Sequence, residues 1–190
     1  TDGSPQVLEG ATTTITVTLN PVSGRTVTIP ISVNASSTAN DPKDYVFSAK
    51  TLTMLAGETS ATVTLTILAD QLDEFEEDVL IDIDPPTFAA EFGEQQKLVR
   101  IENTNATSTV SLAVDQVLLS ENGIATNTNV IVRLNRVSAK DITVTLKKIP
   151  GVSPLFPAKD GLDYPLVDTV FIAAGQSSTS TIFQVTADGR

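Results

Sequence analysis

Apolar and polar residues alternate one by one along much of this chain. Because successive side chains of a β-strand point to opposite faces, each alternating stretch would place Val, Ile or Leu on one face and Thr or Ser on the other. No segment shows an apolar stripe of helical period with capping residues. The pattern predicts an all-β protein, and its clearest stretches are residues 15–19, 27–33, 63–67, 79–83, 110–114, 130–134, 142–146 and 170–172.

Short turn signals separate these predicted strands. They are the dipeptides Asn20-Pro21, Ser23-Gly24, Ala56-Gly57, Pro85-Pro86 and Ala174-Gly175. Many short strands at such spacing are typical of an antiparallel β-sandwich or β-barrel.

The chain also repeats itself at an offset of 112 to 119 residues. Glu9-Gly10 matches the segment that begins at Glu121. Asp44-Tyr45 matches Asp163-Tyr164, and Ala69-Asp70 matches Ala187-Asp188. A repeat of this length is a whole domain. We therefore expect two tandem units, 1–105 and 106–190, from a longer array. The first strand of unit one and the last strands of unit two would lie outside this sequence, so that the second unit is truncated.

Composition excludes several classes of function. The 190 residues contain no cysteine and no histidine, which rules out disulfides, thiolate or imidazole zinc sites and a Ser-His-Asp triad. The net charge of −11 disfavours nucleic acid as a partner. No apolar run approaches the roughly 18 residues of a membrane span, so we expect no direct membrane insertion of this segment.

The negative charge is concentrated in one place. Residues 1–105 hold 16 acids and 5 bases, and half of those acids lie between Asp70 and Asp84. The densest run, Asp70 to Asp78, follows one predicted strand and leads into the next. Such a run can be a solvated acidic turn, or it can supply oxygen ligands to a hard cation such as calcium. The run by itself leaves both readings open.

Unit one contains a series of motifs in a fixed order, and unit two repeats them up to the equivalent of Asp70. The motifs are Glu9-Gly10, a strand, Asp41-x-x-Asp44-Tyr45, Thr51-Leu52-Thr53-x-x-Ala56-Gly57-Glu58, an alternating strand, and Asp70-x-x-x-Glu74-x-x-Glu77. This order resembles the Calx-beta domain family. The resemblance implies an immunoglobulin-like antiparallel β-sandwich of about seven strands with calcium at one end.

Carried over residue by residue, the resemblance implies a set of calcium ligands in unit one. In a Greek-key sandwich, loops distant in sequence converge at one end, so acids from three loops would form one oxygen cage. Asp44 would equally cap the turn before Tyr45, and the two roles can coexist. The expected ligands are Glu9, Asp44, Asp70, Glu74 and Glu77, with Asp73 added from the acidic run and Glu121, Asp163 and Asp188 as a weaker set in unit two.

Other residues of the same types have structural interpretations. Asp78, Asp82 and Asp84 are expected on the solvated face of a strand, and Tyr45 and Tyr164 are expected to pack in the core or at a corner. Calcium-sensing members of the family carry consecutive aspartates before the hairpin and after the last strand. Here those places read Ala69-Asp70 and Ile101-Glu102-Asn103. Fewer carboxylates predict weaker binding, towards the millimolar range of extracellular modules.

The resemblance implies a calcium-binding structural or adhesive module of a multi-repeat extracellular or cell-surface protein, and not an enzyme. Its partners would be neighbouring repeat units, with a cell-surface protein or glycan as a further possibility. One alternative is a regulatory calcium sensor of an exchanger-type membrane protein. A carbohydrate-binding accessory domain is the other, although sugar platforms usually need exposed aromatics and the chain has no Trp and two Tyr.

Overall fold

The computed structural model describes residues 5–115, 126–147 and 169–185, and all regular secondary structure in these ranges is β-strand. The chain divides into two compact units. Unit 1 comprises residues 1–71 and 75–104, and unit 2 comprises residues 72–74 and 105–190. The described ranges contain no helix long and apolar enough to cross a membrane.

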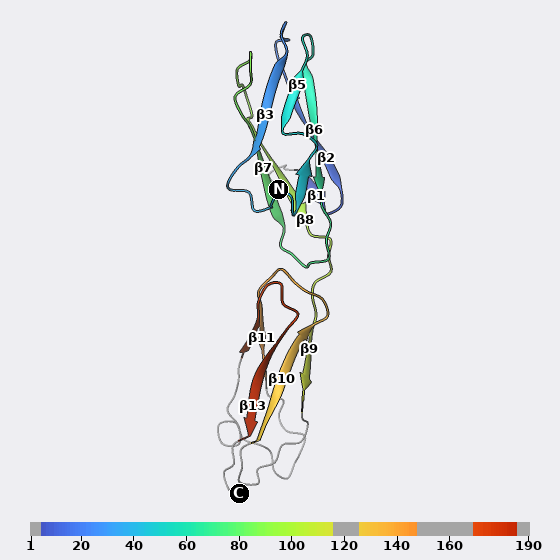
Figure 1. Ribbon diagram of the computed structural model, residues 1–190, viewed down its shortest axis with the longest axis vertical. Helices are drawn as coiled ribbons and strands as arrows, with labels where there is room; N and C mark the ends of the chain where they lie inside the picture. The colour runs from blue at the N-terminus through green and yellow to red at the C-terminus, as the bar shows by residue number, and fades with distance from the viewer. Residues whose placement is uncertain (1–4, 116–125, 148–168, 186–190) are drawn as a thin grey trace. The chain divides into compact units, whose positions relative to one another are not determined.

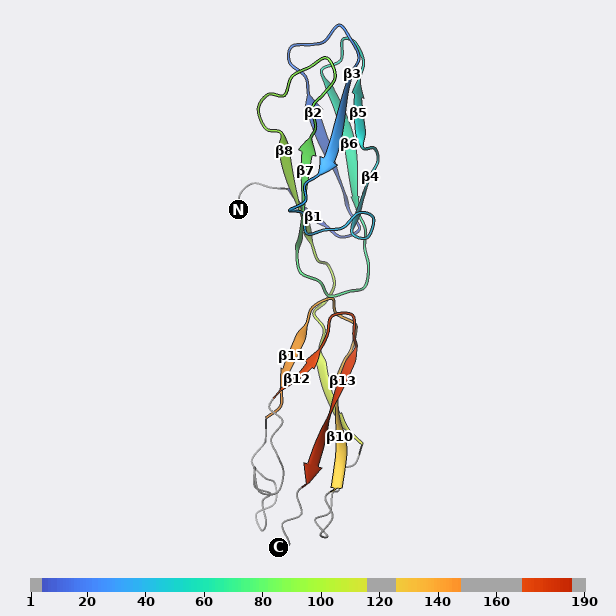
Figure 2. The same ribbon diagram turned by 60° about the vertical axis from the view of Figure 1, so that its left-hand side comes forward.

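Unit 1 consists of two packed sheets (Figures 1 and 2). One sheet has the strand order β1-β8-β7-β3-β5, and the other has the order β2-β6-β4. All pairings are antiparallel except that of β1 with β8. The immunoglobulin-like β-sandwich predicted from the sequence is confirmed. The strands are β1 (Gln6–Leu8), β2 (Thr12–Thr18), β3 (Val27–Val33), β4 (Tyr45–Phe47), β5 (Thr51–Met54), β6 (Ser60–Ile67), β7 (Glu77–Ile83) and β8 (Gln96–Glu102).

The core of unit 1 follows from the alternation in its sequence. Val63, Leu65 and Ile67 of β6 are fully buried, while the Thr residues between them are partly exposed. They pack with Val79 and Ile81 of β7 and with apolar residues of β3 and β8. Burying these side chains fixes the register of each strand, because a shift by one residue would turn the apolar face to water.

Unit 2 contains a three-stranded sheet of order β13-β10-β9 and a two-stranded sheet of β11 and β12. Among the described residues, its hydrophobic core cluster consists of Val132, Leu134, Val170 and Ile172. In contrast to the alternating burial seen in unit 1, all five residues of β9 are exposed. The strands are β9 (Val110–Val114), β10 (Thr126–Leu134), β11 (Ile142–Thr145), β12 (Thr169–Ile172) and β13 (Ser178–Val185).

Candidate metal centre

Strand pairing brings the ends of several strands of unit 1 to the same end of the sandwich. Tyr45, at the start of β4, pairs with Ile67, at the end of β6. Glu77, at the start of β7, pairs with Ile101, and Leu8 pairs with Glu102. The residues that flank these strand ends are therefore neighbours although they are far apart in sequence, and they include Glu9, Asp44, Asp70 and Glu77.

The carboxylates at these positions form two groups. Glu9, Asp70 and Glu74 each place one oxygen within 4.8 Å of the others, and so do Asp44, Glu74 and Glu77. Glu74 belongs to both groups. Carboxylate oxygens are the ligands that calcium prefers, and calcium completes its six to eight ligands with backbone carbonyls and water. The donor set therefore fits calcium, and all five carboxylates were expected from the sequence.

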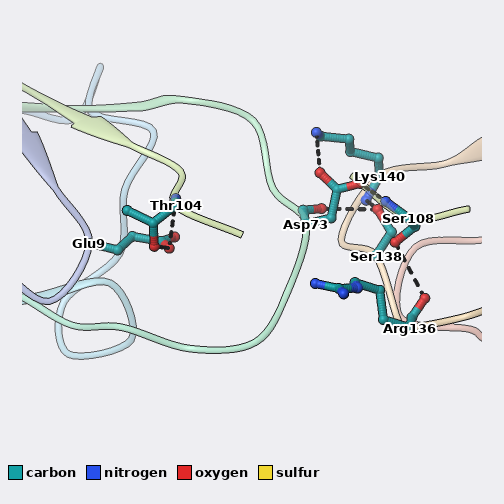
Figure 3. A network of polar contacts seen from close by, with 7 residues as sticks. All are labelled: Glu9, Asp73, Thr104, Ser108, Arg136, Ser138 and Lys140. Atoms are coloured by element: carbon teal, nitrogen blue, oxygen red, sulfur yellow. Dashed lines mark hydrogen bonds and ion pairs between the residues drawn. The ribbon is translucent and has the colours of Figure 1, made fainter. Parts of the chain in front are cut away.

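Glu9 is held in place by the segment that follows β8. The backbone N–H and the hydroxyl of Thr104 both donate to its Oε2, at 3.2 and 3.0 Å (Figure 3). The N–H of Glu9 donates to the carbonyl of Glu102 at 3.2 Å. The side chain and backbone are thus both fixed before any ion binds, which lowers the entropic cost of binding.

Gly10 adopts a left-handed backbone conformation with φ of 78° directly after Glu9. A Cβ at this position would lie 3.4 Å from the Cβ of Ala69, the residue before Asp70. We expect Gly10→Ala to cost about 1–2 kcal/mol in unfolding free energy and to weaken calcium binding, because the strain falls between two ligands. Gly57→Ala is the matched control, since Gly57 also has a positive φ but an added Cβ there meets open space. Equal calcium affinity of the two variants by calorimetry would contradict this prediction.

Asp44 serves as a turn cap as well as a candidate ligand. Its side chain is buried, and its Oδ2 accepts the N–H of Asn40 at 2.6 Å. Its carbonyl accepts the N–H of Leu68 at 2.8 Å, which ties the start of β4 to the end of β6. The two roles considered for this residue are therefore compatible.

Tyr45 is buried beside Asp44 and packs edge-to-face on Phe47 with ring centroids 5.6 Å apart. Burial raises the pKa of its hydroxyl, and the charges of Asp41 and Asp44 raise that pKa further. Tyr45 is therefore a core residue, as the sequence predicted.

Asp73 lies in neither carboxylate group. It is 2% exposed and is part of unit 2, where its Oδ1 accepts from Nζ of Lys140 at 2.6 Å and its Oδ2 accepts from the N–H of Ser108 at 2.9 Å (Figure 3). Its carbonyl accepts from the hydroxyl of Ser138 at 2.9 Å. The hydrogen bond from Lys140 lowers the pKa of the Asp73 carboxyl, and the bond from Ser108 lowers it further. Both oxygens already bond within unit 2, so Asp73 acts there as a buried anchor.

Asp78 and Asp82 of β7, and Asp84 directly after it, have partners outside the two carboxylate groups. Asp78 accepts from the guanidinium of Arg100 at 2.9 and 3.2 Å. Asp82 accepts from the amide of Asn34 at 2.8 Å, and Asp84 accepts from the hydroxyl of Ser32. These contacts fit the strand-face positions expected for them. The weaker ligand set of the second unit, Glu121, Asp163 and Asp188, lies outside the described residues, as does Tyr164.

Sequence reasoning missed the residues that hold the acids in place. Thr104 fixes Glu9, and Lys140 and Ser108 fix Asp73. Threonine, serine and lysine at these positions belong to no motif with a characteristic spacing. The contacts join residues 35 to 95 positions apart, so a local pattern contains no signal for them.

A β-sandwich that gathers carboxylates from three loops at one end defines a class of calcium-binding domains. A search with models of known families agrees: the Calx-beta domain model matches residues 3–111. The chain belongs to the Calx-beta family.

Comparisons with solved structures found matches at low sequence identity. CBD12 from CALX1.2 is 14% identical to this chain; the match covers 99% of this chain and 74% of that chain, with a TM-score of 0.49. The apo form of the Calx CBD1 domain is 17% identical to this chain. The match covers 54% of this chain and 92% of that chain, with a TM-score of 0.47. A putative carbohydrate-binding protein from Bacteroides ovatus is 11% identical to this chain. The match covers 76% of this chain and 48% of that chain, with a TM-score of 0.42. A search of curated protein sequences found no match.

Proposed function

We propose that the chain is a calcium-binding structural module of a multi-repeat extracellular or cell-surface protein. The observation that carries the proposal is the pair of carboxylate groups that share Glu74. Carboxylates held this close repel one another, and a divalent cation between them removes the repulsion. Glu9, Asp70 and Glu74 would hold one ion, and Asp44, Glu74 and Glu77 would hold a second or complete the first.

Calcium would order the loop between β6 and β7, which supplies Asp70 and Glu74. Asp73 of the same loop is already fixed in unit 2 by Lys140 and Ser108. An ordered loop would therefore have less freedom on both sides of Asp73, and in this way calcium would stiffen the connection between consecutive units. Partners of such a module would be neighbouring repeats and a cell-surface protein or glycan.

Calorimetric titration of calcium into the purified chain tests the proposal. We expect binding in the millimolar class, and Glu74→Gln should weaken it at least tenfold because one substitution removes a ligand from both groups. Asp82→Asn is the matched control, since it removes the same charge from the strand face and should leave the affinity nearly unchanged. Absence of binding heat at millimolar calcium, or equal losses in the two variants, would contradict the proposal. Submicromolar binding would favour a regulatory sensor over a structural module.

A further inference from the structure

A short turn in unit 2 holds the buried Asp73. The hydroxyl of Ser138 and the backbone N–H of Ala139 both donate to the carbonyl of Asp73, at 2.9 and 3.1 Å. Nζ of Lys140 donates to its Oδ1 at 2.6 Å (Figure 3). These three donors come from consecutive residues, 138–140, which we call the aspartate-binding turn. It binds both the backbone and the carboxylate of one residue.

Unit 1 contains a turn with the same sequence pattern. Residues 19–25 align without a gap with residues 134–140 and share Leu, Asn, Val and Ser at the same places. The residues that correspond to the aspartate-binding turn are therefore Ser23, Gly24 and Arg25. The basic residue is an arginine in place of lysine, and a guanidinium also donates well to carboxylates.

The two turns also share their internal hydrogen bonds. In each, the serine Oγ accepts the N–H of the residue two positions further on, at 3.0 Å for Ser23 and 3.1 Å for Ser138. The serine carbonyl accepts the N–H of a glycine, Gly57 in unit 1 at 2.9 Å and Gly175 in unit 2 at 2.8 Å. The same internal bonds position the serine hydroxyl and the following N–H in both units.

In unit 1 this turn is formed without an aspartate. The hydroxyl of Ser23, the N–H of Gly24 and the guanidinium of Arg25 donate to no oxygen of the described residues. Ser23 is partly exposed, whereas Ser138 is fully buried. The guanidinium of Arg25 lies over the ring of Phe88, 5.1 Å from its centroid. A guanidinium stacked in this way still presents its N–H groups to a carboxylate.

We propose that Ser23, Gly24 and Arg25 form a second aspartate-binding turn, which takes an aspartate from the acidic loop of another Calx-beta unit. The hydroxyl and the N–H would bond to the backbone carbonyl of that aspartate, and Arg25 would bond to its carboxylate. The partner is the equivalent of Asp73, the residue held by the corresponding turn of unit 2. The proposal rests on neighbouring repeats as partners, but it uses none of the calcium ligands, so either can fail while the other stands.

A synthetic peptide with the sequence of residues 69–77 and blocked ends tests the site on the full chain, in chelator. Titration followed by NMR should shift the amide signal of Gly24 saturably, while that of Ala139, already bonded to Asp73, changes little. Two control peptides of equal charge carry Asp73→Asn or Asp70→Asn. The first should bind at least about tenfold more weakly than the unchanged peptide, and the second should bind about as tightly.

Variants of the full chain test the role of the basic residue. Arg25→Gln should weaken peptide binding at least about tenfold, whereas Arg25→Lys, the residue that unit 2 uses, should retain it. Arg133→Gln removes an exposed arginine of β10 and is the matched control. Gly24→Ala keeps the N–H, and its Cβ would meet open space, so it should bind as the unchanged chain does.

Three results would overturn the proposal. They are the absence of a saturable shift at Gly24, equal affinities of the two asparagine peptides, and equal losses in Arg25→Gln and Arg133→Gln. The peptide comparison uses the unchanged chain, so it decides the matter even where a variant fails to fold.

Discussion

In calcium at about 100 times the dissociation constant found by titration, unit 1 should unfold at a temperature about 10 °C or more above that measured in chelator. An ion present at 100 times its dissociation constant adds about 2.7 kcal/mol to the unfolding free energy, and 1 kcal/mol shifts the melting temperature of a domain of this size by about 4–8 °C. The physical reason is the pair of carboxylate groups around Glu74, whose repulsion the ion removes. Tyrosine fluorescence of a Tyr164→Phe variant follows unit 1, because Tyr45 is then the only tyrosine in the chain.

Magnesium and Glu74→Gln provide the controls for this shift. Magnesium demands smaller, near-octahedral coordination and keeps its waters, so it should stabilise unit 1 much less than calcium does. Glu74→Gln should lose most of the response to calcium, because the substitution removes a ligand from both carboxylate groups. A melting temperature that is the same in calcium and in chelator would refute the stabilising role of the ion.

Asp73→Asn should destabilise unit 2 by about 2–3 kcal/mol. The substitution removes the charge that pairs with Lys140, whose side chain is 24% exposed, while Asp73 itself is almost fully buried. Hydrogen exchange of β10 and β13 measures the loss. Asp115→Asn is the matched control in the same unit: Asp115 accepts from Asn129 at an exposed position, and its loss should cost less than about 0.5 kcal/mol.

The stability of the unchanged chain and that of Asp73→Asn should depend differently on pH. The pKa of Asp73 is lowered in the folded state, so its contribution is complete above the pKa of the unfolded chain and disappears as pH falls through the folded value. The stability difference between the unchanged chain and Asp73→Asn should therefore shrink on acidification. A difference that stays constant from neutral pH down through the carboxyl range would show that the charge of Asp73 contributes nothing.

The fold could be predicted because a strand with one buried face shows apolar residues at every second position of its sequence. Val63, Leu65 and Ile67 alternate with threonines in the sequence, and they are the residues buried in β6. The same reasoning was less informative for β9. Val110, Leu112 and Val114 alternate equally well, yet they are 42–61% exposed. Alternation records which residues share a face, but not whether another element covers that face.

For the candidate metal centre, the sequence predicted the five carboxylates but not that Asp73 of the acidic run lies outside it. The resemblance to the Calx-beta family implied Glu9, Asp44, Asp70, Glu74 and Glu77, and the convergence of distant loops at one end of a sandwich agrees with that choice. Nothing local distinguishes Asp73 from its neighbours in the acidic run. Its different role depends on Lys140, which is 67 residues further along the chain, and on the N–H of Ser108. Contacts of this kind depend on the three-dimensional arrangement and leave no periodic trace.

The position of Asp73 has a consequence for dissecting the molecule. Residues 72–74 are part of unit 2 although they are encoded within the span of unit 1. A fragment that begins at residue 105 would therefore lack the partner of Lys140 and the acceptor for the N–H of Ser108. Such a fragment should be less stable than unit 2 in the whole chain, and adding a peptide that spans the β6–β7 loop should restore part of the difference. Unit 2 is, in this sense, a non-contiguous folding unit whose assembly requires an earlier piece of the polypeptide.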